Sequence, residues 1–171
     1  MTAHCPYLGP SLERGHTSWT LYEAVCGVED VEAEIFYAAV QAAERVRSSM
    51  PRRRGAFVCE NGAVLHAGGE ALQWPHWALK HLYAPVGLMV GKFAAGEERA
   101  NRSGRSVPPP PLSFLPVRVA VRSRDGRFLR ATPELAAAVE AAVDDGHDVL
   151  GEIGHDWKDV KAWAQQLLPR R

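Results

Sequence analysis

The sequence has no excess of charge of either sign, because 20 lysines and arginines are matched by 20 aspartates and glutamates. Nucleic acids and anionic membrane surfaces are bound through a positive field, so we expect neither as a partner. No apolar run approaches the roughly 20 residues that cross a bilayer, and the first twelve residues lack the pattern of a secretion signal. We therefore expect a soluble protein without membrane association.

Cysteine is scarce, with Cys5, Cys26 and Cys59 scattered along the chain and no Cys-x-x-Cys pair. An odd, dispersed set is typical of a reducing compartment rather than of a disulfide framework. This pattern predicts a cytoplasmic protein.

Several catalytic signatures are absent as well. The sequence has no Walker phosphate loop, no Gly-x-Gly-x-x-Gly, no Gly-x-Ser-x-Gly and no zinc-ligand spacing, which excludes several common enzyme classes. What remains is an ordinary globular composition, with 46% hydrophobic and 23% charged residues among 171. A chain of this size predicts a single domain over residues 1–171.

Helix signals stand near both ends of the chain. Asp30 and Asp156 are good N-caps, and Pro75 and Pro133 suit a first helical turn. With apolar residues at helical spacing, these signals predict helices that begin near each of those residues, and a shorter helix is indicated nearer the N-terminus. The helix that begins near Asp30 is expected to end before Pro51, the one near Pro133 at Gly146, and the one after Asp156 at Pro169. The shorter helix is expected over residues 19–25.

Strand signals occupy the middle. Asn61-Gly62 and Asp125-Gly126 separate β-prone runs and predict two hairpins. The run Val86–Phe93 between them predicts a central strand. We expect an α+β fold in which a central, largely antiparallel sheet of about five strands is flanked by four or five helices.

One long irregular segment, 94–116, contains Arg99, Arg102 and Arg105 and then the proline run 108–111. A connection of this length inside a compact domain is typically functional or disordered. Its place between two expected strands makes it a candidate flap over a site.

Two histidines lie on the helix that begins near Pro75. His76 and His81 are five residues apart, about 140° around the helix axis, so they are not expected to share one metal ion. His81 shares a face with Trp77, on which a flat ligand could pack. The alternative is that Trp77 belongs to the core and that both histidines have local partners.

Glycine and arginine alternate with valine in two expected strands. Gly87 and Gly91 lie on one face of the Val86–Phe93 run, and Arg118 lies on the polar face of the next strand. If the strands are neighbours, they form a shallow floor with an arginine rim that suits a flat or anionic molecule. The alternative is an amphipathic sheet with its arginines in solvent.

Two further patterns invite a ligand reading. Cys5-Pro6 resembles the short motifs that can ligate haem iron, whereas the default expectation for these residues is a disordered terminus. His147-Asp148 recurs as His155-Asp156, and these oxygen and imidazole groups could hold a divalent ion. A helix stop followed by an N-cap is the simpler explanation of that loop.

Three motifs together resemble a known family. Cys5-Pro6-Tyr7, Gly-Leu-Met-Val-Gly-Lys-Phe at 87–93, and Arg118 to Leu129 look like a family of uncharacterised bacterial domains with a Cys-Pro-Phe opening and a Gly-Leu-Met-Ile-Gly-x-Phe strand. The similarity spans nearly the whole chain. The resemblance implies that the protein takes part in bacterial specialised metabolism, but it does not imply a particular activity.

More distantly, the layout is similar to haem-dependent N-hydroxylases of guanidino amino acids. Trp77–His81 and Val121–Asp125 match their motifs in outline, whereas Arg99–Pro111 replaces a histidine-bearing segment and contains no histidine. This resemblance implies a haem cofactor and oxidation of a nitrogen-bearing, amino-acid-like substrate.

From these observations we expect a small tailoring enzyme with a small-molecule substrate, with a second copy of the chain as a further candidate partner. His81 would be the axial haem ligand, with His76 or Cys5 as second choices, and the arginines at 102, 105 and 118 would hold carboxylates. The sequence names no catalytic residue. The alternative is a non-catalytic ligand-binding or partner protein that uses the extended, proline-rich segment 107–112.

Overall fold

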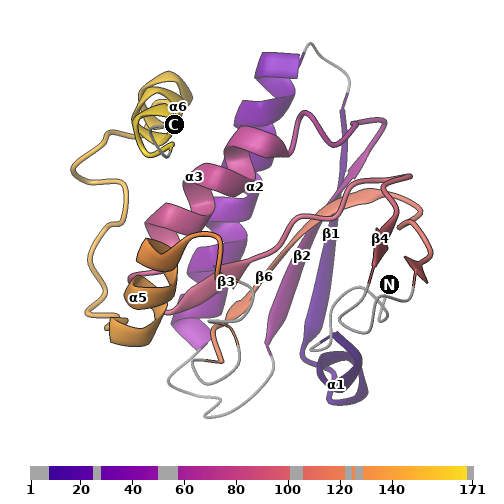
Figure 1. The fold of residues 1–171 in the computed structure, drawn as a ribbon, viewed down its shortest axis with the longest axis horizontal. Coiled ribbons are helices and arrows are strands. Elements are labelled where there is room, and N and C mark those ends of the chain that lie inside the picture. The colour runs from indigo at the N-terminus through magenta and orange to yellow at the C-terminus, as the bar shows by residue number, and fades with distance from the viewer. Residues whose placement is uncertain are drawn as a thin grey trace.

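The computed structural model describes residues 8–24, 28–49, 58–100, 106–121, 125 and 129–168. Within these ranges a four-stranded sheet has the order β1-β2-β6-β3, and a two-stranded ladder pairs β4 with β5 (Figure 1). The strands are β1 (Thr17–Glu23), β2 (Cys59–Leu65), β3 (Leu88–Val90), β4 (Arg99–Ala100), β5 (Ser106–Val107) and β6 (Ser113–Val119). The helices are α1 (Leu8–Glu13), α2 (Val28–Ser49), α3 (Gln73–Tyr83), α5 (Pro133–Ala141) and α6 (Trp157–Gln166).

The expected α+β class is confirmed, with four strands in the main sheet where about five were expected. β1 and β2 are parallel, whereas β2–β6 and β6–β3 are antiparallel. The parallel pair follows from the connection, because α2 carries the chain from one end of β1 back to the start of β2, the geometry that parallel neighbours require. The sheet is therefore mixed, with antiparallel pairing at two of its three junctions.

Residues 19–25 were expected to form a helix, and that expectation is wrong. They belong largely to β1, which runs in register with β2 from Thr17 opposite Cys59 to Glu23 opposite Leu65. The segment is rich in threonine, tryptophan and tyrosine, which favour a pleated strand. The sheet neighbour, which no local helix signal reveals, decides the conformation.

The hairpin expected at Asn61-Gly62 is also wrong, because both residues lie inside the continuous strand β2. Asn61 is buried, and its side-chain amide donates to the Ser18 carbonyl at 3.0 Å. Gly62 stands between Thr20 of β1 and Leu115 of β6. Pairing on both edges uses the strand's backbone groups, so the turn that this dipeptide favours does not form.

The second expected hairpin, at Asp125-Gly126, is described only in part. β6 ends at Val119, and the Asp125 amide donates to the Val121 carbonyl at 2.9 Å, the spacing of a helical turn. Residues 126–128, which would begin the returning arm, lie outside the described residues. Of the run 86–93, only Leu88–Val90 form β3, and β3 is an edge strand that pairs with β6 rather than a central strand.

The helix predictions hold well. α2 and α3 cover the predicted segments, and α5 begins at Pro133 as expected, although it ends at Ala141 before Gly146. α6 follows Asp156, whose carboxylate accepts the Lys158 amide at 2.8 Å. Asp156 is thus a cap as predicted, whereas Asp30 lies inside α2, which begins at Val28, and Pro75 is the third residue of α3 rather than the first. The residues before α3 and α5 make no side-chain cap hydrogen bond, so the starts of these two helices do not depend on such a cap.

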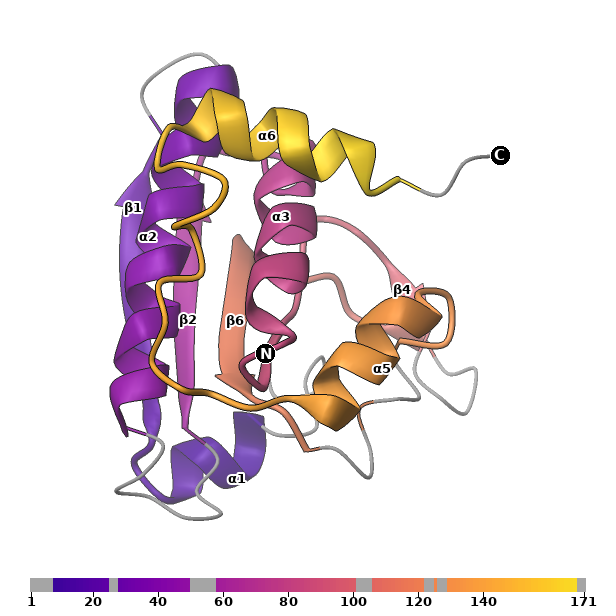
Figure 2. The ribbon, with the colours of Figure 1, turned by 90° about the vertical axis from the view of Figure 1, so that its left-hand side faces the viewer.

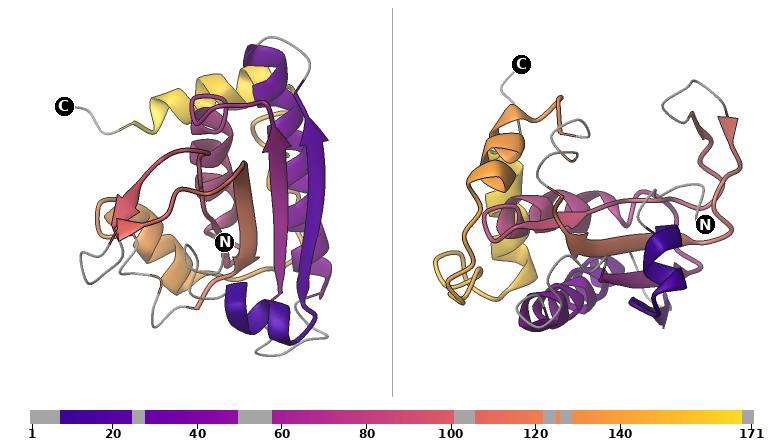
Figure 3. Two further views of the ribbon diagram at one scale, coloured as in Figure 1. Left: turned by 90° about the vertical axis from the view of Figure 1, so that its right-hand side faces the viewer. Right: turned by 90° about the horizontal axis from the view of Figure 1, so that it is seen from below.

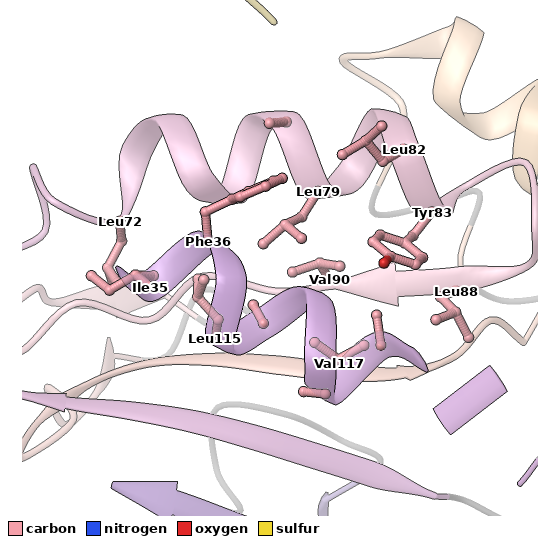
Figure 4. Close-up of a cluster of buried hydrophobic side chains, with 14 of the residues drawn as sticks. Ile35, Phe36, Leu72, Leu79, Leu82, Tyr83, Leu88, Val90, Leu115 and Val117 are labelled. Carbon is pink, nitrogen blue, oxygen red and sulfur yellow. The ribbon is translucent and has the colours of Figure 1, made fainter. Parts of the chain in front are cut away.

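The core lies between α2, α3 and one face of the sheet (Figure 4). Phe36 of α2 and Leu79 of α3 meet Val90, Leu115 and Val117 of the strands, and all five side chains are buried. Because side chains alternate along a strand, Met89 and Arg118 project from the opposite face. In the part of the chain that the structure describes, no helix has both the length and the apolar composition of a membrane span.

Candidate ligand site at the contact of α3 and α6

Two aromatic side chains from distant segments flank the candidate ligand His81. Trp77 lies one turn before His81 on α3, with its ring centroid 4.5 Å from the imidazole, and Trp163 of α6 approaches the same ring edge-on at 6.4 Å. Figure 2 shows α6 lying across α2 and α3. All three side chains are partly buried. We call this group the Trp77–His81–Trp163 cluster.

The imidazole of His81 has an orphaned nitrogen. Its Nε2 atom is buried and has no hydrogen-bond partner. Burial lowers the pKa of His81 below 6.5, and the Lys80 charge acts in the same direction against the opposing effect of Glu134. His81 is therefore neutral near pH 7, the form in which a ring nitrogen can donate a lone pair to a metal ion.

Lys80 and Glu134 add charge beside the cluster. Burial lowers the pKa of Lys80, and the carboxylate of Glu134 on α5 partly offsets that effect. Glu134 raises the pKa of both Lys80 and His81 through its negative charge, so α5 brings an acidic group near both side chains. The cluster thus combines aromatic surface, an unpaired nitrogen and one group of each charge.

α6 covers this site and is held in place by contacts with α2 and α3. The Trp77 indole donates to the Ala164 carbonyl at 3.0 Å, and Lys161 forms an ion pair with the buried Glu32 of α2 at 2.6 Å. Trp157 is buried against Phe36 with ring centroids 4.9 Å apart. A ligand that binds the His81 nitrogen must therefore displace part of this cover.

His76 faces another part of the fold. Its Nε2 lies 3.2 Å from the Val90 carbonyl of β3, whereas His81 faces α6. The five-residue spacing indicated such a separation. Among the described residues, no three His, Cys, Asp or Glu side chains are grouped so that they could hold a metal ion.

The predicted floor of glycine and arginine is occupied by the protein's own groups. A Cβ on Gly91 would lie 2.9 Å from the Pro116 ring, and Gly87 has a φ of 82° in a turn before β3. Arg118 donates to the buried carboxylate of Asp125 at 2.8 and 2.7 Å. Since Arg118 lies on the face away from α2 and α3, the structure does not bring it to His81.

The remaining predicted site residues, Cys5, Arg102 and Arg105, lie outside the described residues. The His-Asp loop forms two local pairs instead of one cluster. His147 Nδ1 lies 2.5 Å from the Asp145 carboxylate, and His155 Nε2 lies 3.2 Å from the Asp148 carboxylate.

Sequence reasoning missed two important groups, Trp163 and Asp125. Trp163 had one signal, the helical spacing of Trp157, Val160 and Ala164 that marks the buried side of α6. Asp125 had a misleading one, because Asp-Gly favours a turn while the aspartate is in fact buried against Arg118.

Comparison with protein-family models, curated proteins and solved structures gave no match. The resemblances drawn from the short motifs therefore remain predictions, and the function is argued from the site alone.

Proposed function

We propose that the protein binds a flat, largely apolar molecule at the Trp77–His81–Trp163 cluster, and that haem is the first such molecule to test. The observation that supports this is the orphaned nitrogen of a neutral His81 between two tryptophans. A buried polar atom without a partner costs free energy, and such a group is often explained by a ligand.

The donor chemistry of the cluster fits haem. His81 would hold the iron through its imidazole nitrogen, and Trp77 and Trp163 would form part of an apolar wall around the cofactor. Haem would supply the oxidative chemistry, on a nitrogen-bearing, amino-acid-like substrate, as expected of a tailoring enzyme. The chain's own residues would orient the cofactor and exclude water, and binding would require α6 to shift from the His81 nitrogen.

A haemin titration of the apoprotein tests this proposal. We expect a Soret band that saturates at one haemin per chain and quenching of tryptophan fluorescence over the same range. His81→Ala should lose or shift the band, whereas His155→Ala, at an exposed histidine, should leave it unchanged. Absence of a saturable band, or a band insensitive to His81→Ala, would refute haem ligation by this residue.

A second candidate function has its own supporting observation, the exposure of the proline-rich segment 107–112. Pro108, Pro109 and Pro111 are exposed, whereas Pro110 is buried. The ends of the segment are fixed, because Val107 pairs with Arg99 and the Ser113 hydroxyl donates to the Ala67 carbonyl at 2.9 Å. We propose that this segment, which is held at both ends, binds to an aromatic groove on a partner protein.

Affinity purification of the tagged protein compares the wild type with Pro108→Ala/Pro111→Ala. A partner that co-purifies with the wild type in a constant molar ratio, and that is lost with the double variant, supports partner binding by segment 107–112. Pro133→Ala, at an exposed proline that begins α5, is the control and should retain the partner. A partner retained by both variants argues against this segment.

A further inference from the structure

β1 is an edge strand that lacks the usual protection against pairing. Within the described residues its only strand neighbour is β2, and Figure 3 shows it at the margin of the sheet. Natural edge strands are guarded by lysine, proline, bulges or short length. The seven residues of β1 contain no lysine, proline or glycine, so the outer edge is competent to pair.

The hydrogen bonds to β2 show which backbone groups point outward. The Ala24 amide donates to the Leu65 carbonyl at 3.2 Å, and the His16 carbonyl accepts the Cys59 amide at 3.0 Å. Even-numbered residues of β1 therefore direct their amides and carbonyls toward β2. The odd-numbered residues direct theirs to the free edge, since these groups alternate along a strand: Thr17, Trp19, Leu21 and Glu23.

The same odd-numbered positions place exposed apolar side chains beside that edge. Leu21 is 60% exposed and Trp19 is 37% exposed. Trp19 packs on the buried Phe114 at 5.5 Å between ring centroids, and Phe114 stacks on Phe93 at 4.8 Å. An apolar strip thus continues from the interior of the sheet to the margin at which no described strand pairs with β1.

We propose that two copies of this chain dimerise by antiparallel pairing of β1 with β1 about a twofold axis at Thr20. This register places Trp19 opposite Leu21 of the second copy and Thr17 opposite Glu23 of the second copy. All four positions have outward-pointing backbone groups, so their pairs close the hydrogen-bonded rings of an antiparallel ladder. The two sheets join into one eight-stranded sheet.

A second copy fits this edge better than an unrelated peptide because the strand is complementary to itself. The twofold brings both exposed apolar side chains of one copy onto those of the other, on the same face of the sheet. It also places the acidic Glu23 beside the strand end that follows Arg14. A twofold centred at Leu21 would instead set Trp19 opposite Glu23, and one centred at Trp19 would set Leu21 opposite Thr17.

The size of the contact sets the expected affinity. Seven paired residues extend over about 23 Å, and their edge with two apolar side chains covers less than the roughly 800 Å² per partner of a standard interface. We therefore expect a reversible dimer whose measured mass rises with protein concentration toward twice the chain mass of 18.7 kDa.

Sedimentation equilibrium of the wild type and two Leu21 variants tests the interface. Leu21→Lys adds a charge to the strip, and Leu21→Pro removes an amide that points away from β2, so both should retain the fold and weaken dimerisation at least tenfold. Circular dichroism and thermal unfolding check the fold. A wild type that is monomeric at all concentrations, or a dimer that both folded variants retain, would overturn the proposal.

Disulfide trapping tests the register, in a chain with Cys5→Ser and Cys26→Ser. Thr20→Cys would face itself in a non-hydrogen-bonded pair about 4.5 Å apart between Cα atoms, within disulfide reach. Ser18→Cys would lie four residues out of register and should not cross-link. Cross-linking of Thr20→Cys alone supports the proposal, and cross-linking of Ser18→Cys alone or of neither overturns it.

Discussion

The carboxylate of Asp125 is fully buried and receives both terminal nitrogens of Arg118, at 2.8 and 2.7 Å. This pair joins β6 to Asp125, six residues beyond the end of the strand. Removing one partner leaves a buried charge without its counterion. We expect Asp125→Ala to lower the free energy of unfolding by about 3–5 kcal/mol, measured by urea denaturation.

The companion variant isolates that penalty. Arg118→Met/Asp125→Leu removes both charges and should recover most of the loss, because a buried ion pair contributes little net stability compared with apolar groups of similar size. If the double variant is as unstable as Asp125→Ala, the pair itself is the source of stability.

Gly91 and Gly62 offer a matched pair of glycine substitutions. A Cβ on Gly91 would lie 2.9 Å from Pro116 and 3.4 Å from Phe93, whereas one on Gly62 would meet only the Leu115 carbonyl at 4.0 Å. We expect Gly91→Ala to cost about 1–3 kcal/mol through overpacking. Gly62→Ala should cost nothing, since glycine weakens a strand interior. Equal effects in thermal unfolding would show that Pro116 yields easily.

Asp144 predicts a dependence of stability on pH. Its hydrogen bond from Arg47, at 2.6 Å, holds the pKa of Asp144 below the ordinary value of 3.8. The stabilisation is therefore complete above pH 3.8 and is lost as the pH falls through the lower pKa of the folded protein. Near pH 7, Asp144→Asn should cost about 1.5 kcal/mol.

Denaturation from pH 7 to pH 2 measures this difference, which should shrink only at the acidic end. Glu152→Gln, at an exposed carboxylate, is the control and should leave the profile unchanged. A difference between Asp144→Asn and wild type that persists undiminished at pH 2 would contradict the assignment.

Replacing His81 should stabilise the fold, whereas replacing a core histidine that has hydrogen-bond partners would destabilise it. Because its Nε2 has no partner, His81→Phe should raise the free energy of unfolding by about 1 kcal/mol, the lower end of the cost of an unsatisfied buried polar group. A loss of stability in His81→Phe would mean that the imidazole has a partner in solution.

The pKa of His81 supplies a second readout. Burial lowers it below 6.5, so the unfolded chain takes up a proton before the folded one does. Wild-type stability at this site is present above pH 6.5 and declines as the pH falls toward the folded pKa. NMR titration of the ring protons should place the midpoint below 6.5, and the advantage of His81→Phe should grow over that window.

How much was predictable differs between helices and strands. Asp156 as a cap and Pro133 at a first turn are local signals, and the helices begin where these residues indicate. Asn61-Gly62 is an equally good local signal for a turn, yet the pairing of β2 with two neighbours overrides it. The low strand propensity of asparagine and glycine amounts to about 1 kcal/mol, which a ladder of hydrogen bonds and buried side chains outweighs.

The candidate site divides in the same way. The spacing along α3 alone predicts that Trp77 and His81 share a helix face and that His76 lies on another, because helical spacing is local geometry. By contrast, the fold is needed to see that Trp163 covers His81, that Asp125 pairs with Arg118, and that β1 is at an edge of the described sheet. Those contacts join residues that are brought together by the packing of the sheet and the helices, and no short-range sequence pattern encodes that packing.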